Sequence, residues 1–500
     1  MGKHFLHDLR TRFANQPNRP AIMHRGRTTT HGELESLALR CAAGLTHLRV
    51  EPGDRVALFT ADKFPFLVAQ LGAMFAGAVP LPLNPRFTRE EMRFFLTDSD
   101  AKAIVVGAEQ LPMIHALAGE LPQPPVVIPD SQVLSQTAPP AREPTVAADD
   151  PGLILYSSGT TGWPKGVVHS HANVASALAG LAACWRMSSD DVVVNALPLF
   201  HIHGLAFATH MTWLAGGCVA IEDAFEPAET LAAIGRGTVF MAVPPMYYRL
   251  LDDPRFRPAA KTWPNVRLFT CGSAPIRTEV LPELESILGR PVINRYGMTE
   301  AFVITSLPLA GPWPSGSVGL PLAGVELRVT RDDGTSASPG EVGGVAIRGP
   351  NLFRQYWQQP AATAAAFATG WFDTGDLGTL DANGMLTLVG RKHDLIITSG
   401  YNVYPQVVER VLGECPGVKE CAVLGLPDAD RGERVAAAVV ASDPTLDEAT
   451  LRNWCRDRLV HYQQPKTICI VGELPKNSLG KVLRRELREA LQESANSAKL

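Results

Sequence analysis

The most telling segment of the chain is Tyr156-Ser157-Ser158-Gly159-Thr160-Thr161-Gly162-Trp163-Pro164-Lys165-Gly166, directly behind the apolar run Leu153-Ile154-Leu155. The ten positions after Tyr156 hold four hydroxyl side chains, three glycines and one lysine. Glycines let a backbone approach a ligand closely, and clustered N–H groups, hydroxyls and an ammonium can hold several phosphate oxygens. We interpret the segment as a cradle for a nucleotide triphosphate. Its spacing, Gly-x-x-Gly-x-x-Lys-Gly, lacks the Gly-Lys-Ser/Thr ending of a P-loop and so disfavours an ordinary P-loop ATPase; a flexible polar loop is the alternative.

Composition is typical of soluble globular proteins. The 500 residues are 46% apolar and 19% charged, which allows two or three domains with cores of their own. A net charge of -4 on this length gives no electrostatic argument for nucleic acid or an anionic membrane as a partner. The site must therefore draw its specificity from local residues.

Compartment and membrane signals are weak. The eight cysteines form no C-x-x-C pair and no secretory apolar segment is present, so we expect reduced thiols and a cytoplasmic location. No apolar run reaches the roughly 18 residues of a membrane span, which argues against stable membrane insertion. The terminal Ala498-Lys499-Leu500 only approximates a peroxisomal tripeptide.

The order of apolar segments predicts an α/β fold in two parts. Short apolar runs at residues 56–59, 104–106, 192–194 and 266–269 alternate with longer helix-like segments such as 66–75. After Arg391 the pattern becomes a compact α+β unit, with helices at 405–414 and 446–459 and strands at 418–425, 435–441 and 467–471. We expect a large N-terminal domain of layered sheets and helices, residues 1–391, and a small mobile domain, residues 392–500.

A second chemical segment is Asn294-Arg295-Tyr296-Gly297-Met298-Thr299-Glu300, placed after a predicted strand end at residues 291–293. The carboxyl ends of strands commonly present ligand contacts. A tyrosine can stack on a purine, a threonine can bond a phosphoryl oxygen, and a glutamate can hold Mg²⁺ beside substrate phosphates. A plain strand-to-loop turn is the alternative.

Three further groups complete the set. Asp376, between a glycine and an apolar residue, could accept both ribose hydroxyls, or could be a turn aspartate bonded to its own backbone. Gly390-Arg391-Lys392-His393-Asp394 follows it. Lys481 ends a glycine turn near the C-terminus, where a solvated surface lysine would otherwise be the rule.

Together and in this order, the segments resemble the acyl-adenylate-forming superfamily of acyl-CoA synthetases, firefly luciferases and nonribosomal adenylation domains. The likeness runs from about residue 153 to residue 481 and rests on five separate motifs. It implies an enzyme that uses ATP, Mg²⁺ and coenzyme A on a small carboxylic acid. The large domain would bind ATP and the acid, and the small domain would rotate between two half-reactions.

The resemblance also assigns residues. Glu300 would hold Mg²⁺, Thr299 would contact the α-phosphate, and Lys481 would reach both the acid's carboxylate and the α-phosphate, offsetting the charge that builds up there. His393 matches the hinge position, where Asp or Lys is more usual. The expected cofactor contacts are Ser157, Ser158, Gly159, Thr160, Thr161, Gly162 and Lys165 at the outer phosphates, Gly272, Ser273, Ala274, Pro275 and Tyr296 beside adenine, Asp376 and Arg391 at the ribose, Ser399 and Gly400 along the pantetheine arm of CoA, and Gly297, Met298 and Tyr401 as further cofactor-binding residues.

The acid itself is indicated by the segment Leu197-Pro198-Leu199-Phe200-His201-Ile202-His203-Gly204, which resembles the family's acyl pocket, with His201 facing the acid. It contains no aspartate to pair an amino acid's ammonium. His201 and His203, alternating on a strand, would need a partner ligand to hold a metal, and none is evident.

Arg295 is the sharper indication, because a fixed guanidinium beside the pocket suits a second carboxylate. The arginine, with these motifs, looks like malonyl-CoA synthetases, so malonate is the first expectation and methylmalonate the second. If Arg295 instead forms a structural ion pair, the pocket would suit a medium-chain or aromatic acid. A pseudoenzyme is disfavoured by the joint presence of Glu300, Asp376, Arg391 and Lys481, and nothing recommends luciferase-like oxygenation.

Overall fold

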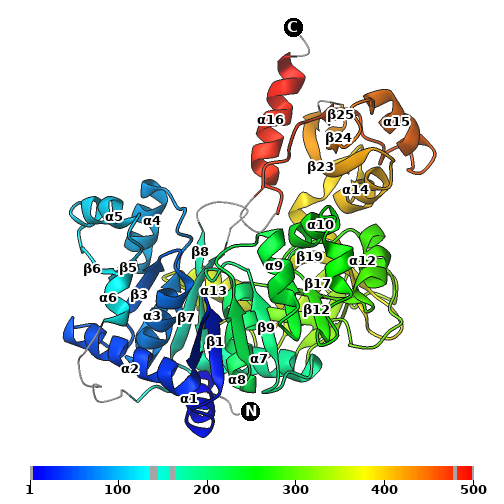
Figure 1. Ribbon diagram of the computed structural model, residues 1–500. Helices are drawn as coiled ribbons and strands as arrows, with labels where there is room; N and C mark the ends of the chain where they lie inside the picture. Colours follow the sequence, from blue (N-terminus) through cyan, green and yellow to red (C-terminus); the bar gives the residue numbers. More distant parts are fainter. Residues whose placement is uncertain (1–3, 136–144, 158–163, 429, 477–480, 498–500) are drawn as a thin grey trace.

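The computed structural model describes residues 4–135, 145–157, 164–428, 430–476 and 481–497, with side chains up to residue 492. The protein is a mixed α/β structure with a large N-terminal domain and a small C-terminal domain (Figure 1). In the described residues the main sheet has 13 strands. Their order is β16 (Glu326–Thr330), β17 (Gly343–Arg348), β19 (Phe372–Leu380), β20 (Leu386–Arg391), β15 (Ser317–Pro321), β14 (Phe302–Ser306), β13 (Val292–Met298), β12 (Leu268–Cys271), β11 (Val239–Ala242), β9 (Val192–Asn195), β10 (Cys218–Ile221), β1 (Pro20–His24) and β2 (Arg27–Thr30).

The pairing within this sheet changes direction at β13. From β1 through β10, β9, β11 and β12 to β13 every pair is parallel, whereas from β13 to β16 every pair is antiparallel. Parallel strands are covered on both faces, which fits their continuous apolar sequences, such as VFMA in β11 and LFTC in β12. The carboxyl ends of the parallel strands therefore lie along one edge, where side chains from β12 and β13 can meet.

Two smaller sheets stand beside the main one. One is parallel, in the order β4 (Val79–Pro82), β3 (Arg55–Phe59), β5 (Ala101–Val106) and β6 (Val126–Pro129), and the other is antiparallel, with β18 (Gln355–Tyr356), β8 (Lys165–Ser170) and β7 (Pro151–Ser157). The helices of the large domain are α1 (Phe5–Asn15), α2 (His31–His47), α3 (Lys63–Phe75), α4 (Arg89–Ser99), α5 (Leu111–Ala118), α6 (Asp130–Leu134), α7 (His171–Cys184), the π-helix η1 (His203–His210), α8 (Met211–Ala215), α9 (Pro227–Ile234), α10 (Pro244–Leu251), α11 (Phe256–Ala260), the 3₁₀-helix η2 (Thr278–Val280), α12 (Leu281–Leu288) and α13 (Pro360–Phe367).

Local chemistry sets the helix starts. Thr30 caps α2 in a capping box with Glu33, and the Asp62 side chain caps α3 by accepting from the backbone of Phe64. Helix α3 is apolar on almost every side and is buried along its whole length, as expected for a helix enclosed between α2 and the β3 sheet. It thereby joins the small parallel sheet to the rest of the domain.

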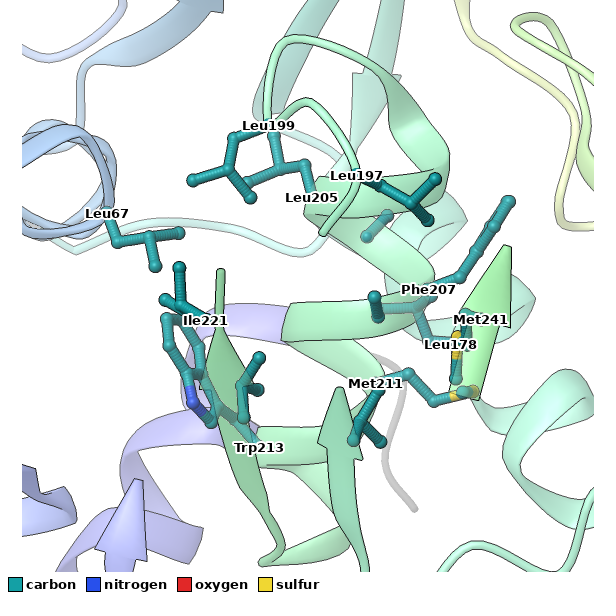
Figure 2. Packing of buried hydrophobic residues seen from close by; sticks show 14 of the residues in the cluster. Leu67, Leu178, Leu197, Leu199, Leu205, Phe207, Met211, Trp213, Ile221 and Met241 are labelled. Atoms are coloured by element: carbon teal, nitrogen blue, oxygen red, sulfur yellow. The ribbon is translucent and has the colours of Figure 1, made fainter. Parts of the chain in front are cut away.

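The largest apolar core packs around the parallel half of the main sheet and its helices, and a separate cluster covers the antiparallel strands β15 to β20. Figure 2 shows part of the largest core, with Leu205, Phe207 and Met211 pointing from one continuous helical segment into side chains from the neighbouring strands. Trp213 on the same segment is fully buried, and its indole N–H donates to the carbonyl of Ala21 at 3.0 Å. This packing fixes the segment that follows the predicted acyl pocket.

The small domain has its own cores. Its sheet runs β22 (Tyr401–Val403), β21 (Ile396–Thr398), β24 (Gly432–Ala441) and β23 (Val418–Asp428), with β25 (Thr467–Ile470) paired to β24. Its helices are the 3₁₀-helix η3 (Lys392–Asp394), α14 (Pro405–Gly413), α15 (Glu448–Arg456) and α16 (Arg484–Ser497). Val408, Leu412, Val439 and Leu451 belong to one cluster formed entirely within the domain.

Most of the predicted segments are confirmed. The runs at 56–59, 104–106, 192–194 and 66–75 lie in β3, β5, β9 and α3, and the five predicted elements of the small domain correspond to α14, β23, β24, α15 and β25. The strand end predicted at residues 291–293 is wrong: β13 continues to Met298, because it leaves its parallel partner β12 after Asn294 and pairs antiparallel with β14 instead. Within the described residues, no helix is long and apolar enough to cross a membrane, and the cytoplasmic location stays a prediction.

Candidate active site

The described ends of the cradle segment lie on the paired strands β7 and β8. Ser157 and Lys165 are cross-strand partners, and the Ser157 hydroxyl lies 3.5 Å from the Lys165 carbonyl oxygen as its donor. The Tyr156 hydroxyl donates to the Asp98 carboxylate and so connects β7 to α4. The predicted contacts between these strands, Ser158, Gly159, Thr160, Thr161 and Gly162, lie outside the described residues.

Glu300 is held beside the cradle by an aromatic bridge. The Tyr356 hydroxyl donates to its carboxylate at 3.4 Å, and the Lys165 ammonium lies 4.9 Å from the centroid of the same tyrosine ring. Glu300 is only 9% exposed, and burial raises its pKa. A buried carboxylate with few compensating partners is well suited to hold Mg²⁺, which uses one or two carboxylates together with phosphate oxygens and water. The sequence analysis did not identify Tyr356, because its strand, β18, has only two residues and so shows no recognisable pattern.

The neighbouring Thr299 is positioned through its backbone. Its carbonyl accepts from Nε2 of His169 at 2.7 Å, and burial lowers the pKa of that imidazole to about 4, so it stays neutral. Gly297 follows a bulge in the pairing of β13 with β14, and a Cβ there would meet the Phe302 carbonyl oxygen at 1.9 Å. Only glycine fits at this close approach of the two backbones, and the chain continues from it to Met298 and Thr299.

Buried Tyr296 and Asp376 form one cluster with the half-buried Arg391. The Tyr296 hydroxyl donates to one carboxylate oxygen of Asp376, and Nε of Arg391 lies 3.1 Å from the other. Asp376 and Arg391 are direct partners on β19 and β20. Burial and the Asp376 charge raise the pKa of the Tyr296 phenol, which keeps the hydroxyl protonated as a donor.

Asp376 is not the turn aspartate that the sequence left open. That role falls to Asp373, whose carboxylate accepts from the backbone of Gly375 at 2.9 Å. Asp376 lies in β19, and its own N–H donates to the Thr374 hydroxyl at 3.1 Å. The hydrogen bonds that the Asp376 carboxylate accepts therefore come from side chains and not from its own backbone, as is suitable for a group that binds a ligand.

Lys481 reaches this cluster from the small domain. Its pKa is lowered to about 8, mainly by burial and then by repulsion from Arg391, while the charges of Asp376 and Asp394 offset part of the fall. Lys481 thus interacts electrostatically with both members of the Asp376–Arg391 pair. Two groups about 90 residues apart in the chain are therefore brought together across the domain boundary.

Arg295 lies at the carboxyl end of the parallel strands, with its guanidinium 4.8 Å from the centroid of the Phe207 ring. It is only 4% exposed, and burial lowers its pKa to about 10. No carboxylate of the described residues comes within 4.0 Å of it, which removes the structural ion pair as an explanation there. Gly272 makes room for it, since a Cβ at that position would meet Nε of Arg295 at 2.6 Å.

Ser273 and His203 complete this corner. Nη2 of Arg295 donates to the Ser273 hydroxyl at 3.4 Å, and that hydroxyl lies 3.2 Å from Nδ1 of His203. With Ser273 donating to Nδ1, the imidazole carries its proton on Nε2. Nε2 of His203 and Nε of Arg295 are both buried and have no hydrogen-bond partner among the described residues. Two neighbouring unsatisfied donors are the pattern expected where an anionic ligand group binds.

His201 lies in the turn before η1, and His203 begins that π-helix, so the expected alternation on a strand is wrong. The turn tightens where Gly204 approaches the Pro198 carbonyl, which a Cβ would meet at 2.4 Å. Burial lowers the pKa of His201 to about 4 and that of His203 well below its usual range. Both imidazoles are neutral at pH 7, and π-helical turns are frequent at functional sites.

The remaining predicted residues are more dispersed. Ala274 and Pro275 follow Ser273 in the loop after β12. Ser399 and Gly400 form the positive-φ turn between β21 and β22 in the small domain, and Tyr401 after them is 55% exposed and stacks on Tyr462. The expected hinge residue, His393, lies in η3 directly after β20.

The fold and site define an enzyme that binds a nucleotide and activates an acid. The chain belongs to the AMP-binding enzyme family, and it is an AMP-forming acyl-CoA ligase: the family model matches residues 9–357, and the model of the AMP-binding enzyme C-terminal domain matches residues 407–481.

Particular relatives cover almost the whole chain. The crystal structure of ATP-bound MatB from Rhodopseudomonas palustris superposes with a TM-score of 0.92 at 36% identity, over 98% of this chain and 99% of that one. A feruloyl-CoA synthase of Amycolatopsis is 35% identical over 94% of this chain and 96% of its own length. The mitochondrial malonate–CoA ligase ACSF3 of Bos taurus is 33% identical over 92% of this chain and 86% of its own length.

Proposed function

We propose that this acyl-CoA ligase converts malonate, or as a second choice methylmalonate, to the corresponding CoA thioester, with ATP cleaved to AMP and pyrophosphate. The observation that carries the proposal is the buried Arg295 guanidinium, which has no carboxylate partner among the described residues. A carboxylate at the far end of a short diacid would supply one. The similarity to the malonate–CoA ligase of Bos taurus supports the same substrate.

In this proposal the diacid lies between two cationic groups. Its distal carboxylate would meet Arg295 and the Nε2 proton of His203, which are both unsatisfied. Its reacting carboxylate would lie toward Thr299 and Lys481, with His201 beside the chain of the acid. Anion recognition by a guanidinium and a neutral N–H donor is selective for carboxylate geometry.

We propose the following nucleotide contacts. Asp376 and Arg391 bind the ribose, and Tyr296 and the loop from Gly272 to Pro275 flank the adenine. Ser157 and Lys165 hold the outer phosphates. Glu300 would hold Mg²⁺, which screens the phosphate charge when bound.

The chemistry has two steps. A carboxylate oxygen attacks the α-phosphorus, forming the acyl–AMP anhydride as pyrophosphate leaves, and the CoA thiol then attacks the acyl carbon as AMP leaves. The first step brings two anions together, so it depends on fixed positive charge. The protonated Lys481 supplies that charge beside Asp376 and Arg391.

For the second step we propose that residues 392–500 rotate about His393 relative to residues 1–391. The turn at Ser399 and Gly400, with Tyr401, then lines the path of the pantetheine arm. This turn lies on the small domain's sheet, so a rotation of that domain carries it as a unit.

An aromatic or medium-chain acid is the second candidate. It is favoured by the similarity to the feruloyl-CoA synthase, whose identity of 35% is close to the 33% of the malonate–CoA ligase. The two candidates differ in whether the acid offers Arg295 a second carboxylate.

CoA-dependent AMP release separates the two candidates. The purified enzyme is given malonate, methylmalonate, succinate, butyrate, octanoate and ferulate in turn, and pyrophosphate exchange without CoA isolates the first step. We expect malonate to give the highest kcat/KM. A higher kcat/KM with butyrate, octanoate or ferulate would overturn the diacid assignment.

A further inference from the structure

Lys63 carries a buried charge that the nucleotide chemistry does not use. It is the first residue of α3, and it is only 6% exposed. Burial lowers its pKa to about 8, while the charges of Asp223 and Glu222 act in the opposite direction. No carboxylate of the described residues lies within 4.0 Å of its ammonium. A lysine in such a place needs other compensation to remain charged.

That compensation comes from two backbone carbonyls. The ammonium of Lys63 donates to the carbonyl of Leu197 at 2.8 Å and to the carbonyl of Glu222 at 2.6 Å. Leu197 follows β9, and Glu222 follows β10, its parallel neighbour in the main sheet. One side chain from a helix of the small parallel sheet thus joins the carboxyl ends of two strands of the main sheet.

The segment that begins at Leu197 is the predicted acid-binding loop, residues 197–204. Asn195 also bonds to this backbone: it accepts from the N–H of Leu197 at 3.0 Å and donates to the carbonyl of Gly204 at 2.9 Å, a carbonyl that also accepts from the Thr209 hydroxyl at 2.8 Å. Asn195 fixes both ends of the loop, and Lys63 fixes the carbonyl at its start. His201 and His203 lie between these ties.

We propose that Lys63 is a positioning residue for the acid site, which sets the path of the loop 197–204 and thereby the placement of His201 and His203. The inference rests on the proposed role of this loop in binding the acid. Removing the ammonium takes the donor from the buried carbonyl of Leu197 and from the half-buried carbonyl of Glu222, and we expect the loop to shift as the Leu197 carbonyl finds another donor. The nucleotide contacts lie on other strands and do not depend on this tie.

The test compares the full-length enzyme with its Lys63→Met variant. We expect the KM for the acid to rise at least tenfold and the KM for ATP to change less than twofold. Hydrogen exchange at residues 197–204 should become faster, whereas exchange in β13 and β19 should not. Lys63→Arg retains donors for both carbonyls and should restore most of the acid affinity.

Lys102→Met provides the matched control, because Lys102 lies on β5 of the same small sheet but is exposed. The acid used is whichever gives the highest turnover, and the exchange measurement needs no acid, so an error in the malonate assignment leaves the test intact. Equal changes in the KM values for acid and ATP, or an acid KM and loop exchange unchanged in Lys63→Met, would overturn the proposal. If Lys63→Met does not fold, Lys63→Gln is judged by the same criteria.

Discussion

Replacing Arg295 with methionine should change the substrate preference of the enzyme without lowering its stability. The difference between the ordinary pKa of 12.5 and the value of about 10 in this site corresponds to about 3 kcal/mol of penalty on the buried cation. The guanidinium remains protonated at pH 7, so the folded protein bears this penalty throughout the neutral range. A methionine of similar shape removes it, and replacing buried charge by apolar groups is often neutral or stabilising by about 1–4 kcal/mol. We therefore expect an unchanged or higher melting temperature.

The same change should remove the preference for diacids. Truncating one partner of a buried, hydrogen-bonded charge pair costs about 2–5 kcal/mol, and about 3 kcal/mol corresponds to roughly 150-fold. The ratio of kcat/KM for malonate to kcat/KM for butyrate should fall by about that factor in Arg295→Met. CoA-dependent AMP release measures both acids, and scanning calorimetry measures stability.

Arg27→Met, at an exposed position on β2, is the control for a general loss of positive charge. An unchanged malonate-to-butyrate ratio in Arg295→Met would refute the reasoning. A melting temperature lower by many degrees would also refute it, because the contacts of Arg295 with Ser273 and Phe207 would then outweigh the penalty on the buried charge.

Three further changes probe the nucleotide side. Lys481→Ala should reduce acyl-adenylate formation by about 10²–10³-fold, the usual effect of losing one stabilising group in a transition state, while thioester formation from supplied acyl–AMP falls much less; equal loss in both assays would remove the assigned role. Because the protonated form of Lys481 is the active one and its pKa is about 8, pyrophosphate exchange should be level below pH 8 and decline above it, and a decline that persists in Lys481→Arg would point to another group. Tyr296→Phe deletes a donor to the Asp376 carboxylate, worth about 1.5–3 kcal/mol, so the KM for ATP should rise at least tenfold with little change in the KM for the acid; an ATP KM within twofold of the wild-type value would show that this bond does not support the nucleotide site.

Periodic segments with clear ends were predictable from the sequence. Helix α3 and the small-domain strands β23 and β24 combine long apolar runs with clear boundaries, and local pattern was enough to place them. The extension of β13 was not predictable, because Asn294 to Met298 is polar and glycine-containing and becomes a strand only by pairing with β14. The π-helix at His203 is likewise set by tertiary packing rather than by residue preference.

In the candidate site, too, some residues could be predicted from the sequence and others could not. Lys165, Glu300, Asp376 and Lys481 stand in motifs dense enough to be noticed. Their supports, His169 and Tyr356, are single residues in unremarkable strands, and their importance comes from contacts with residues 130 and 56 positions away. Lys63 is a further case, because its two carbonyl partners have no side-chain signature at all.

The change of strand direction at β13 separates the proposed acid contacts from the proposed ribose contacts. Side chains at the parallel end, such as Ser273, His203 and Arg295, surround the proposed acid, whereas Asp376 and Arg391 come from the antiparallel half. Substitutions at His203 or Arg295 can thus change which acid is accepted while leaving the proposed ribose contacts, Asp376 and Arg391, untouched. With this arrangement, one fold can accept different acids when a few residues at one edge of the sheet are exchanged. The residues proposed to bind the ribose need not change.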